Sequence, residues 1–391
     1  MTILTVNTGS SSVRLAAFSD DGGELTEIAS AREDLSASEP QAILRGFCKV
    51  HGLAQIDATV HRVVHGGSNL AASRLIDWEV EREIDRLAPL APLHNPAALR
   101  WIHATREVLG AGIPQVAVFD TAFFTALPEI ARIYAIPHEF AKKYGLYRYG
   151  FHGLAHQAMW LRWREQNPDP SNRWTDQERM DQETAQRANG KGRVISMQLG
   201  AGCSITAIEN GIPRDTSMGF SPLEGLVMAT RSGDIDPGLI TYLQRREGLT
   251  PEQLDELLNE RSGLSGVSGS SGDMRQLLGS PDERSRLAVD LYCYRARKYL
   301  GAYLAVLGGA EAILFGGGVG ENAAPVREKI LTGMEWCGIA IDSRKNYSAS
   351  GMSRISSEGS DVEVWIVPVD EAAILAREAE TILGKDIGFS K

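Results

Sequence analysis

The chain has little cysteine and no long apolar run. No two of its four cysteines, among 391 residues, stand at the C-x-x-C spacing; they are Cys48, Cys203, Cys293 and Cys337. Isolated thiols exclude a disulfide framework and favour a reducing compartment, so we expect a cytoplasmic location. The longest apolar stretch, residues 302–320, contains Glu311 and six glycines. We therefore expect no membrane-spanning helix.

Positive charge is also in short supply. The chain has 50 acidic and 40 basic residues and a formal net charge of -10. An acidic chain repels phosphate backbones, which argues against nucleic acid as a main partner. The first residues, MTILTVNTGS, have neither the basic start nor the apolar run of a signal peptide. The length predicts two or three domains' worth of material.

Several catalytic signatures are missing. The sequence has no H-E-x-x-H and no G-x-S-x-G, and no glycine-rich segment fits G-x-x-x-x-G-K-[ST]. These absences argue against a zinc peptidase, a serine hydrolase and a P-loop enzyme. No glycine-rich segment fits the dinucleotide fingerprint G-x-G-x-x-G well.

What the sequence does have is glycine placed after short apolar runs. The runs 3–6, 194–197 and 312–315 are each followed by a small-residue turn, at 7–12, 199–204 and 316–322. Further apolar runs occupy 115–119 and 362–367, and helix-like segments occupy 287–307 and 371–383. Alternating strands and helices predict an α/β fold with mainly parallel sheets. Such turns expose N–H groups to phosphate oxygens, although a single glycine turn is common without any ligand.

The first two of these turns sit in a repeated pattern. Strand, small-residue turn, strand and second turn recur about 190 residues apart, from residues 3 and 194. This spacing favours two related halves. The polar segment 162–193 interrupts the pattern and predicts a surface excursion with a short helix.

Cationic and acidic residues gather in a few turns. The segments are HRVVHGG at 61–67, PLHNP at 92–96, YRYGFHG at 147–153 and DTSMGFSPLEGLVMATRSGDIDP at 215–237. Arginine binds carboxylate or phosphate in a fork, whereas an isolated Arg or His in a turn is more often structural. Asp120 follows an apolar run, where it can serve a ligand or cap a helix. Glu371 is a magnesium ligand or a plain helix N-terminal acid.

These motifs occur in one order, and the chain resembles the acetate kinase family over nearly its whole length. The family belongs to the superfamily of actin, sugar kinases and heat-shock ATPases. The resemblance implies an α/β fold of duplicated actin-like ATPase (ribonuclease H-like) domains with a central cleft. It implies an N-terminal domain of residues 1–121 joined by a returning helix in 371–391. Residues 122–370 would form a nucleotide-binding and dimerisation domain, with Tyr294, Tyr299 and Tyr303 either at the dimer interface or in the core.

The family's activity is reversible, direct in-line transfer of the ATP γ-phosphoryl group to acetate, giving acetyl phosphate and ADP. The resemblance implies a homodimer that uses Mg²⁺ or Mn²⁺. By motif position the catalytic residues are His152, Arg62, Arg231, Asp120 and His94. The substrate would contact Arg62 and an apolar pocket of Val64, Leu93, Phe151 and Pro222. The metal would be served by Asn7 and Glu371.

The resemblance also implies a set of nucleotide contacts. They are Arg14, Ser10, Ser12, Gly200, Gly202, Asp273, Met274, Arg275, Gly318, Gly320, Glu321 and Asn322. Four positions depart from the family pattern: Arg14 replaces Lys, Gln198 replaces His, Ala201 replaces Asn and Phe124 replaces His. These departures keep two alternatives open: a propionate kinase, and a divergent nucleotide-binding homologue with an altered phosphodonor.

Overall fold

The chain forms two compact units. The computed structural model describes all residues except 10–11, 21–24, 35–37, 93, 169–191 and 387–391. Unit 1 comprises Met1–Thr125, Phe151–Leu154 and Asp370–Lys391, and unit 2 comprises Ala126–Gly150 and Ala155–Val369. Most of the polar excursion expected at 162–193 lies outside the described residues.

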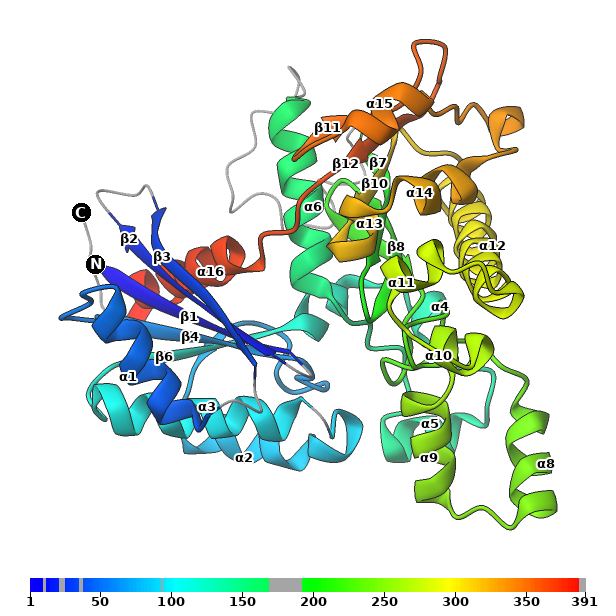
Figure 1. Ribbon diagram of the computed structural model, residues 1–391. Coiled ribbons are helices and arrows are strands. Elements are labelled where there is room, and N and C mark those ends of the chain that lie inside the picture. The colour runs from blue at the N-terminus through cyan, green and yellow to red at the C-terminus, as the bar shows by residue number, and fades with distance from the viewer. Residues whose placement is uncertain (10–11, 21–24, 35–37, 93, 169–191, 387–391) are drawn as a thin grey trace. The chain divides into compact units, whose positions relative to one another are not determined.

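Unit 1 is built on a six-stranded sheet with the order β3-β2-β1-β4-β6-β5 (Figure 1). The strands are β1 (Thr2–Thr8), β2 (Ser12–Asp20), β3 (Leu25–Asp34), β4 (Ala58–Val63), β5 (Arg74–Leu75) and β6 (Gln115–Phe119). The neighbours β1, β4 and β6 run parallel, whereas β2, β3 and β5 pair antiparallel. The carboxyl ends of the three parallel strands therefore meet at one edge of the sheet.

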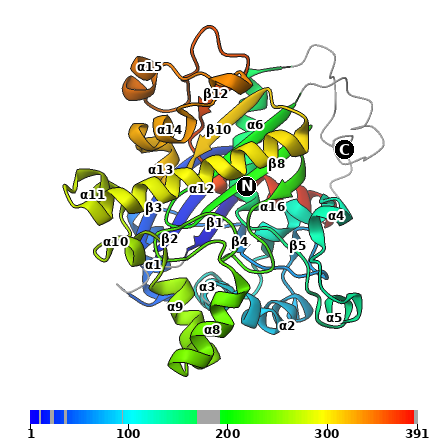
Figure 2. The same cartoon turned by 90° about the vertical axis from the view of Figure 1, so that its right-hand side faces the viewer.

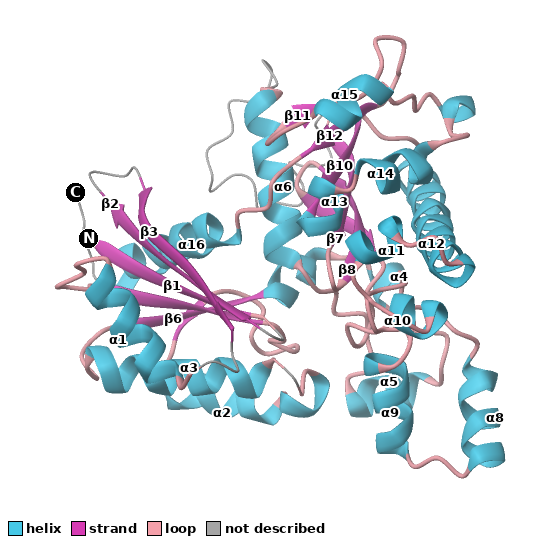
Figure 3. Cartoon of the chain, in the orientation of Figure 1, coloured by secondary structure: helices cyan, strands magenta, loops and turns pink. Residues whose placement is uncertain are grey.

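Helices cover both faces of this sheet (Figure 3). They are α1 (Pro40–Val50), α2 (Trp78–Arg86), α3 (Asn95–Leu109) and α16 (Glu371–Asp386), with short 3₁₀ helices at Ala88–Leu90 and Asp120–Ala126. Alternation along β2 explains both layers: Val13 and Leu15 join the core under α1 and α3, while Phe18 packs with Ala372 and Ala376 of α16. The C-terminal helix thus returns to the first sheet.

Unit 2 repeats the same topology. Its sheet has the order β11-β12-β10-β7-β8-β9. The strands are β7 (Arg193–Leu199), β8 (Cys203–Glu209), β9 (Ile212–Thr216), β10 (Ala312–Gly316), β11 (Ser353–Arg354) and β12 (Glu363–Ile366). Here β7, β10 and β12 are parallel, and β8, β9 and β11 pair antiparallel, as β2, β3 and β5 do in unit 1. The duplication predicted from the spacing is confirmed.

The second half also contains eleven α-helices among the described residues, and α12 and α13 contact this sheet. The eleven helices are α4 (Glu129–Arg132), α5 (His138–Tyr144), α6 (Gly153–Gln166), α8 (Pro237–Glu247), α9 (Pro251–Glu260), α10 (Gly263–Ser268), α11 (Met274–Gly279), α12 (Glu283–Leu307), α13 (Gly317–Asn322), α14 (Ala324–Leu331) and α15 (Ser343–Ser348). A 3₁₀ turn covers Glu335–Cys337. The long α12 crosses one face of the sheet, over β8 (Figure 2). Within the described ranges, no helix is long and apolar enough to cross a membrane.

Candidate active site

The parallel strands of unit 1 bring four polar side chains to one place. Asn7 lies near the end of β1, Arg62 near the end of β4 and Asp120 directly after β6. The fourth, Glu371, is the first residue of α16. Because these strands are hydrogen-bonded neighbours, the fold gathers residues from across the chain at a single sheet edge.

Arg62 is the centre of this cluster. Its Nε donates to both oxygens of Asp120, at 3.1 and 3.2 Å, and its Nη2 donates to Asp120 Oδ2 at 2.6 Å. Its Nη1 donates to Asn7 Oδ1 at 3.1 Å and lies 3.6 Å from Glu371 Oε2. Asn7 Nδ2 in turn donates to Glu371 Oε2 at 2.6 Å. The planar guanidinium is thereby fixed in orientation from three sides.

Asp120 also connects the cluster to His152. Burial raises the pKa of the Asp120 carboxyl, while the Arg62 guanidinium and a hydrogen bond from the His152 backbone N–H act against that rise. His152 itself has φ +59°, a left-handed conformation that non-glycine residues seldom adopt. The following residue, Gly153, packs so closely that a Cβ there would lie 2.0 Å from the Asp120 carbonyl oxygen. The strained turn at His152 is thus built against Asp120.

The composition of this cluster fits a divalent cation. One guanidinium faces two carboxylates, which leaves one negative charge uncompensated. Carboxylate and amide oxygens are the ligands that Mg²⁺ prefers, usually with waters and substrate phosphates completing its shell. Among the described residues no group of three or more His, Cys, Asp or Glu side chains could hold a metal alone. Asn7, Asp120 and Glu371 fit a water-assisted magnesium site.

Next to this cluster lies a buried apolar wall. Val64 and Phe151 are both buried, and the Phe151 ring meets His65 edge-on, with 5.5 Å between ring centroids. Asn95 holds this segment: its Oδ1 accepts from the His65 N–H at 3.2 Å and its Nδ2 donates to the His65 carbonyl at 3.0 Å. Burial lowers the pKa of His65 to about 4. His65 is thus a neutral packing residue beside the wall.

The remaining predicted residues of unit 1 that the structure describes lie on β2 and before α3. Arg14 pairs in register with Asn7 across β1 and β2, and its Nη2 lies 3.7 Å from Glu27. The Ser12 hydroxyl accepts from Arg32 Nε at 3.2 Å. His94 directly precedes α3. Ser10 and Leu93 lie outside the described residues.

In unit 2, three glycine-rich segments converge. The β7–β8 turn is closed by a hydrogen bond from the Gly200 N–H to the Gly202 carbonyl at 3.1 Å. At the end of β10, Gly317 has φ +76°, and a Cβ there would lie 2.7 Å from the Leu199 carbonyl oxygen. The Ala229 N–H donates to the Ala201 carbonyl at 3.0 Å, which joins the segment 217–233 to the same turn. Such clustered turns suit phosphate oxygens.

Arg231 lies in the segment that meets the β7–β8 turn. Its Nη1 donates to the Pro222 carbonyl at 3.2 Å. Burial lowers the pKa of its guanidinium, and the neighbouring Cys203 thiol works in the other direction. Within the part of the chain that the structure describes, Arg231 forms no ion pair, in contrast to Arg62. A largely desolvated guanidinium without a carboxylate is a binding group for an anion.

The other predicted nucleotide residues have contacts of their own. Asp273 caps α11 and pairs with Arg275, whose Nη2 lies 2.7 Å from Asp273 Oδ2; hydrogen bonds from Arg275 lower the pKa of Asp273 to about 2. Met274 is only 4% exposed. Glu321 Oε1 accepts from the N–H groups of Gly317 and Val369, at 3.0 and 3.1 Å.

The last predicted loop residues lie on α13. Gly318 and Gly320 are on this helix, and the Gly318 carbonyl accepts from Asn322 Nδ2 at 2.9 Å. The three tyrosines of α12 differ in environment. Tyr303 is buried in the core, Tyr299 donates to Asp234 at 2.8 Å, and Tyr294 is exposed.

Two of the four departures from the family pattern, Gln198 and Ala201, lie in unit 2, and the other two, Arg14 and Phe124, lie in unit 1. Ala201 is exposed at the tip of the β7–β8 turn. Gln198 precedes that turn, and its Oε1 is buried without a hydrogen-bond partner among the described residues. In unit 1, Phe124 is buried and packs edge-on against Phe123. Phe124 is therefore a packing residue, whereas Gln198 and Ala201 change the polar groups near the β7–β8 turn.

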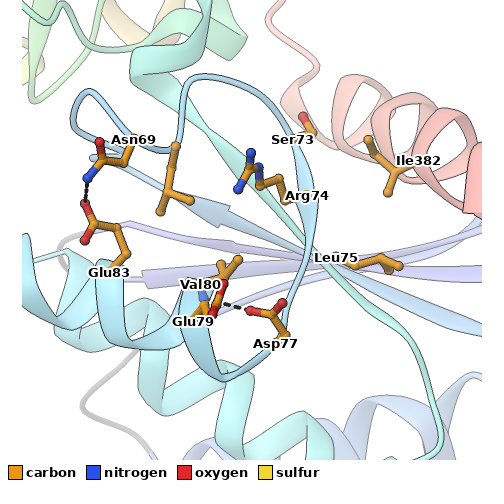
Figure 4. A pocket seen from close by; sticks show the side chains of 10 residues that line it. Asn69, Ser73, Arg74, Leu75, Asp77, Glu79, Val80, Glu83 and Ile382 are labelled. Atoms are coloured by element: carbon orange, nitrogen blue, oxygen red, sulfur yellow. Dashed lines mark hydrogen bonds between the residues drawn. The ribbon is translucent and has the colours of Figure 1, made fainter.

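A separate cavity of about 400 Å³ opens elsewhere in unit 1 (Figure 4). Its wall includes Asn69 and Glu83, which are hydrogen-bonded at 2.9 Å, and Ile382 of α16. Asp77 lies there as the cap of α2. None of the predicted site residues lines this cavity.

Sequence reasoning missed one supporting residue, Tyr134, and the pairing of Arg148 with Glu224. Tyr134 donates to Glu224 Oε2 at 2.5 Å, and Arg148 donates to Glu224 Oε1 at 2.6 Å. Tyr134 lies in no recognisable motif, and its partner is 90 residues away in the chain. The available signal was the position of Glu224 and Arg148 inside motifs rich in glycine.

Comparison with known proteins shows the family of the chain. The family model described as the acetokinase family matches residues 24–377. An acetate kinase of Chloroherpeton thalassium is 45% identical over 339 residues, covering 85% of this chain and 77% of its own. The crystal structure of Porphyromonas gingivalis acetate kinase superposes with a TM-score of 0.81 and 37% identity, covering 98% of this chain and 99% of that one. A propionate kinase structure from Francisella tularensis gives a TM-score of 0.83 and 32% identity, covering 96% and 98%. The chain belongs to the acetate kinase family.

Proposed function

We propose that the chain is an acetate kinase, which transfers the γ-phosphoryl group of ATP to acetate and forms acetyl phosphate and ADP. Family membership supports this activity. The single observation that carries it is Arg231, a largely buried guanidinium that has no ion pair among the described residues and lies beside a glycine-rich turn. Phosphoryl transfer is catalysed mainly by positioning and charge neutralisation, which such a group supplies.

The proposed reaction is a direct in-line displacement. One carboxylate oxygen of acetate attacks the γ-phosphorus, and an O–P bond forms while the bond from that phosphorus to the bridging oxygen of ADP breaks. The electron pair of the broken bond stays on ADP, so the step needs no proton transfer. The transferring group carries its charge on three equatorial oxygens, where cationic donors act.

Unit 1 would supply acetate-binding and metal-binding groups. Arg62 would bind the acetate carboxylate, with its plane fixed by Asp120, while Val64 and Phe151 would face the methyl group. His152 and His94 would donate to phosphoryl oxygens. Magnesium would be held by the oxygens of Asn7, Asp120 and Glu371, and when bound it supplies positive charge to the phosphates. The uncompensated negative charge of the Arg62 cluster supports that assignment.

Unit 2 would supply the phosphate-binding and nucleotide-binding groups. Arg231 would stabilise the equatorial oxygens, and the turn at Gly200 and Gly202 would present N–H groups to the nucleotide phosphates. The loop from Gly318 to Asn322 and the start of α11 at Asp273 would hold the rest of the nucleotide. A homodimer and a cytoplasmic location are further parts of this proposal.

Propionate is the second candidate acceptor. The similarity to the propionate kinase of Francisella tularensis supports it. An extra methylene changes binding by only about 1–3 kcal/mol, so a pocket that admits acetate accepts some propionate as well. Ala201 replaces the asparagine of the family pattern in the phosphate turn, so a different phosphodonor is the third candidate.

The test is an acyl-hydroxamate assay of the purified chain with Mg-ATP. We expect product with acetate and less with propionate. A stronger signal with propionate would move the assignment to propionate kinase, and no product with any short acid would reject the kinase. ATP, GTP and pyrophosphate should be compared as donors in the same assay.

A further inference from the structure

A half-buried polar cluster in unit 2 holds the segment that carries Pro222 and Arg231. It consists of Tyr134, Arg148 and Glu224, and we call it the Tyr134 cluster. Tyr134 lies between α4 and α5, and Arg148 follows α5, so both belong to the segment 126–150. Glu224 is two residues beyond Pro222 on the segment 217–233.

Hydrogen bonds from this cluster fix both ends of a short arc. The Tyr134 hydroxyl accepts from the Phe220 N–H at 2.7 Å and donates to Glu224 Oε2 at 2.5 Å. Only residues 221–223 lie between these two points, and Pro222 is at their centre. One hydroxyl therefore determines where the arc begins and where it ends.

Arg148 holds the same segment from its start. Its Nη1 donates to the carbonyl of Thr216 at 3.0 Å, and its Nη2 donates to Glu224 Oε1 at 2.6 Å. Its Nε donates to the carbonyl of Ala131 at 3.2 Å. The charges of Arg148 and Glu224 are thus paired with each other, and Arg148 also binds backbone carbonyls on both segments.

Gly219 shows how closely the backbone is held. A Cβ at this position would lie 2.1 Å from the Tyr134 hydroxyl oxygen and 1.7 Å from Glu224 Oε2. Only glycine leaves room for these two side chains to meet. At the centre of the arc, the Pro222 carbonyl accepts from Arg231 Nη1 at 3.2 Å, so the position of the arc affects the position of the Arg231 guanidinium.

We propose that the Tyr134 cluster is a positioning device that sets acid selectivity, by fixing the Pro222 wall and the Arg231 guanidinium together. This inference rests on the proposed function and on the place in the acyl pocket that the family resemblance implies for Pro222. A rigid wall penalises a longer acid, and loosening it should let propionate enter more easily while weakening acetate. Among the described residues, the Tyr134 hydroxyl forms its hydrogen bonds with Phe220 and Glu224, and none with the β7–β8 turn.

The test is a steady-state comparison of Tyr134→Phe with the unmodified chain, using acetate and propionate. A net hydrogen bond contributes about 0.5–1.5 kcal/mol, so we expect the acetate KM to rise roughly three- to tenfold. The acetate-to-propionate ratio of kcat/KM should fall, kcat should fall less than KM rises, and the ATP KM should stay unchanged. Glu224→Gln should show the same pattern. Tyr149→Phe is the matched control, because that hydroxyl donates to Gly145 at 2.8 Å within its own segment.

The outcomes separate this inference from the proposed function. If the unmodified chain forms no acyl phosphate from any short acid, the proposed function fails. If it is active but both variants keep its acetate-to-propionate ratio, the positioning role is wrong and the kinase stands. A uniform loss of kcat with every acid, or failure of both variants to fold, would make the cluster a stability element only.

Discussion

The Arg62 guanidinium donates to both carboxylate oxygens of Asp120, with a shortest contact of 2.6 Å. Arg231, its predicted counterpart in unit 2, donates instead to a backbone carbonyl and has no ion pair among the described residues. Two arginines predicted to act in one reaction thus stand in opposite electrostatic settings. Removing each should therefore have different consequences for folding.

Arg62→Ala should reduce both activity and stability. It removes the cation that we propose binds acetate, and a loss of about 10²–10³ in kcat/KM is typical for such a group. It also leaves two carboxylates without their partner, and breaking a buried pair costs about 3–5 kcal/mol. Urea unfolding and acyl-hydroxamate kinetics would measure the two effects. Arg86→Ala, at an exposed pair with Glu83, is the control and should cost at most about 1 kcal/mol.

Arg231→Met should separate activity from stability. The substitution removes a desolvated charge without stranding a carboxylate, so the free energy of unfolding should stay level or rise. We still expect kcat/KM to fall by about 10²–10³. If Arg231→Met unfolds as easily as Arg62→Ala, the two arginines do not differ in electrostatic environment as we describe.

Glu371→Gln should raise the magnesium requirement. The substitution removes the uncompensated negative charge of the Arg62 cluster, which is the structural reason to expect a cation there. Titrating activity with Mg²⁺ should give a half-saturation point at least about tenfold higher, since each 1.4 kcal/mol of lost binding is tenfold. EDTA should abolish activity of the unmodified chain. An unchanged titration curve would remove Glu371 from the metal site.

Gly153→Ala should disturb the turn that carries His152. The added Cβ would lie 2.0 Å from the Asp120 carbonyl oxygen, so the start of α6 must move. We expect a large loss of kcat. Gly46→Ala is the control, because nothing lies within 4 Å of its Cβ on α1, where alanine should stabilise by about 0.5–1 kcal/mol. Equal activity of the two variants would show that the close packing at Gly153 is dispensable.

Buried neutral histidines should make the fold sensitive to acid. Burial lowers the pKa of His61 and His156 to about 3 and that of His65 to about 4, against an ordinary value of 6.5. The unfolded chain therefore binds protons first, so stability is complete above pH 6.5 and falls as the pH drops toward these values. Each histidine should contribute a slope of about 1.4 kcal/mol per pH unit.

Replacing His156 by Asn tests this slope. Urea unfolding between pH 7 and pH 4 gives the free energy of unfolding as a function of pH. For the variant, the slope of this plot should be smaller than for the unmodified chain by about 1.4 kcal/mol per pH unit. Loss of packing alone would lower the free energy of unfolding equally at every pH and leave the slope unchanged. An unaltered slope would mean that His156 is not held neutral in the fold.

The strand framework could be predicted because it depends on local sequence. The apolar run at 115–119 became β6, and the spacing of the first and second glycine turns predicted the duplicated sheets. The two-residue strands β5 and β11 could not be predicted, since neither has a run long enough to show a period.

The site was predicted only as far as motifs extend. Glycine-rich motifs indicated Arg62 and Arg231, and the preceding apolar run indicated Asp120, but residue spacing carries no information on which side chains pair. Arg62 meets Asp120 from 58 residues away, and Tyr134 meets Glu224 from 90 residues away. Those contacts follow from sheet order and loop packing, which arise only in the tertiary structure.

The most direct measurement is a ³¹P NMR spectrum of the purified chain incubated with acetate, ATP and Mg²⁺. The account predicts that acetyl phosphate and ADP appear in equal amounts, and that Arg231→Met, although folded, forms neither at a comparable rate. Release of inorganic phosphate alone, or undiminished acetyl phosphate formation by Arg231→Met, would contradict it.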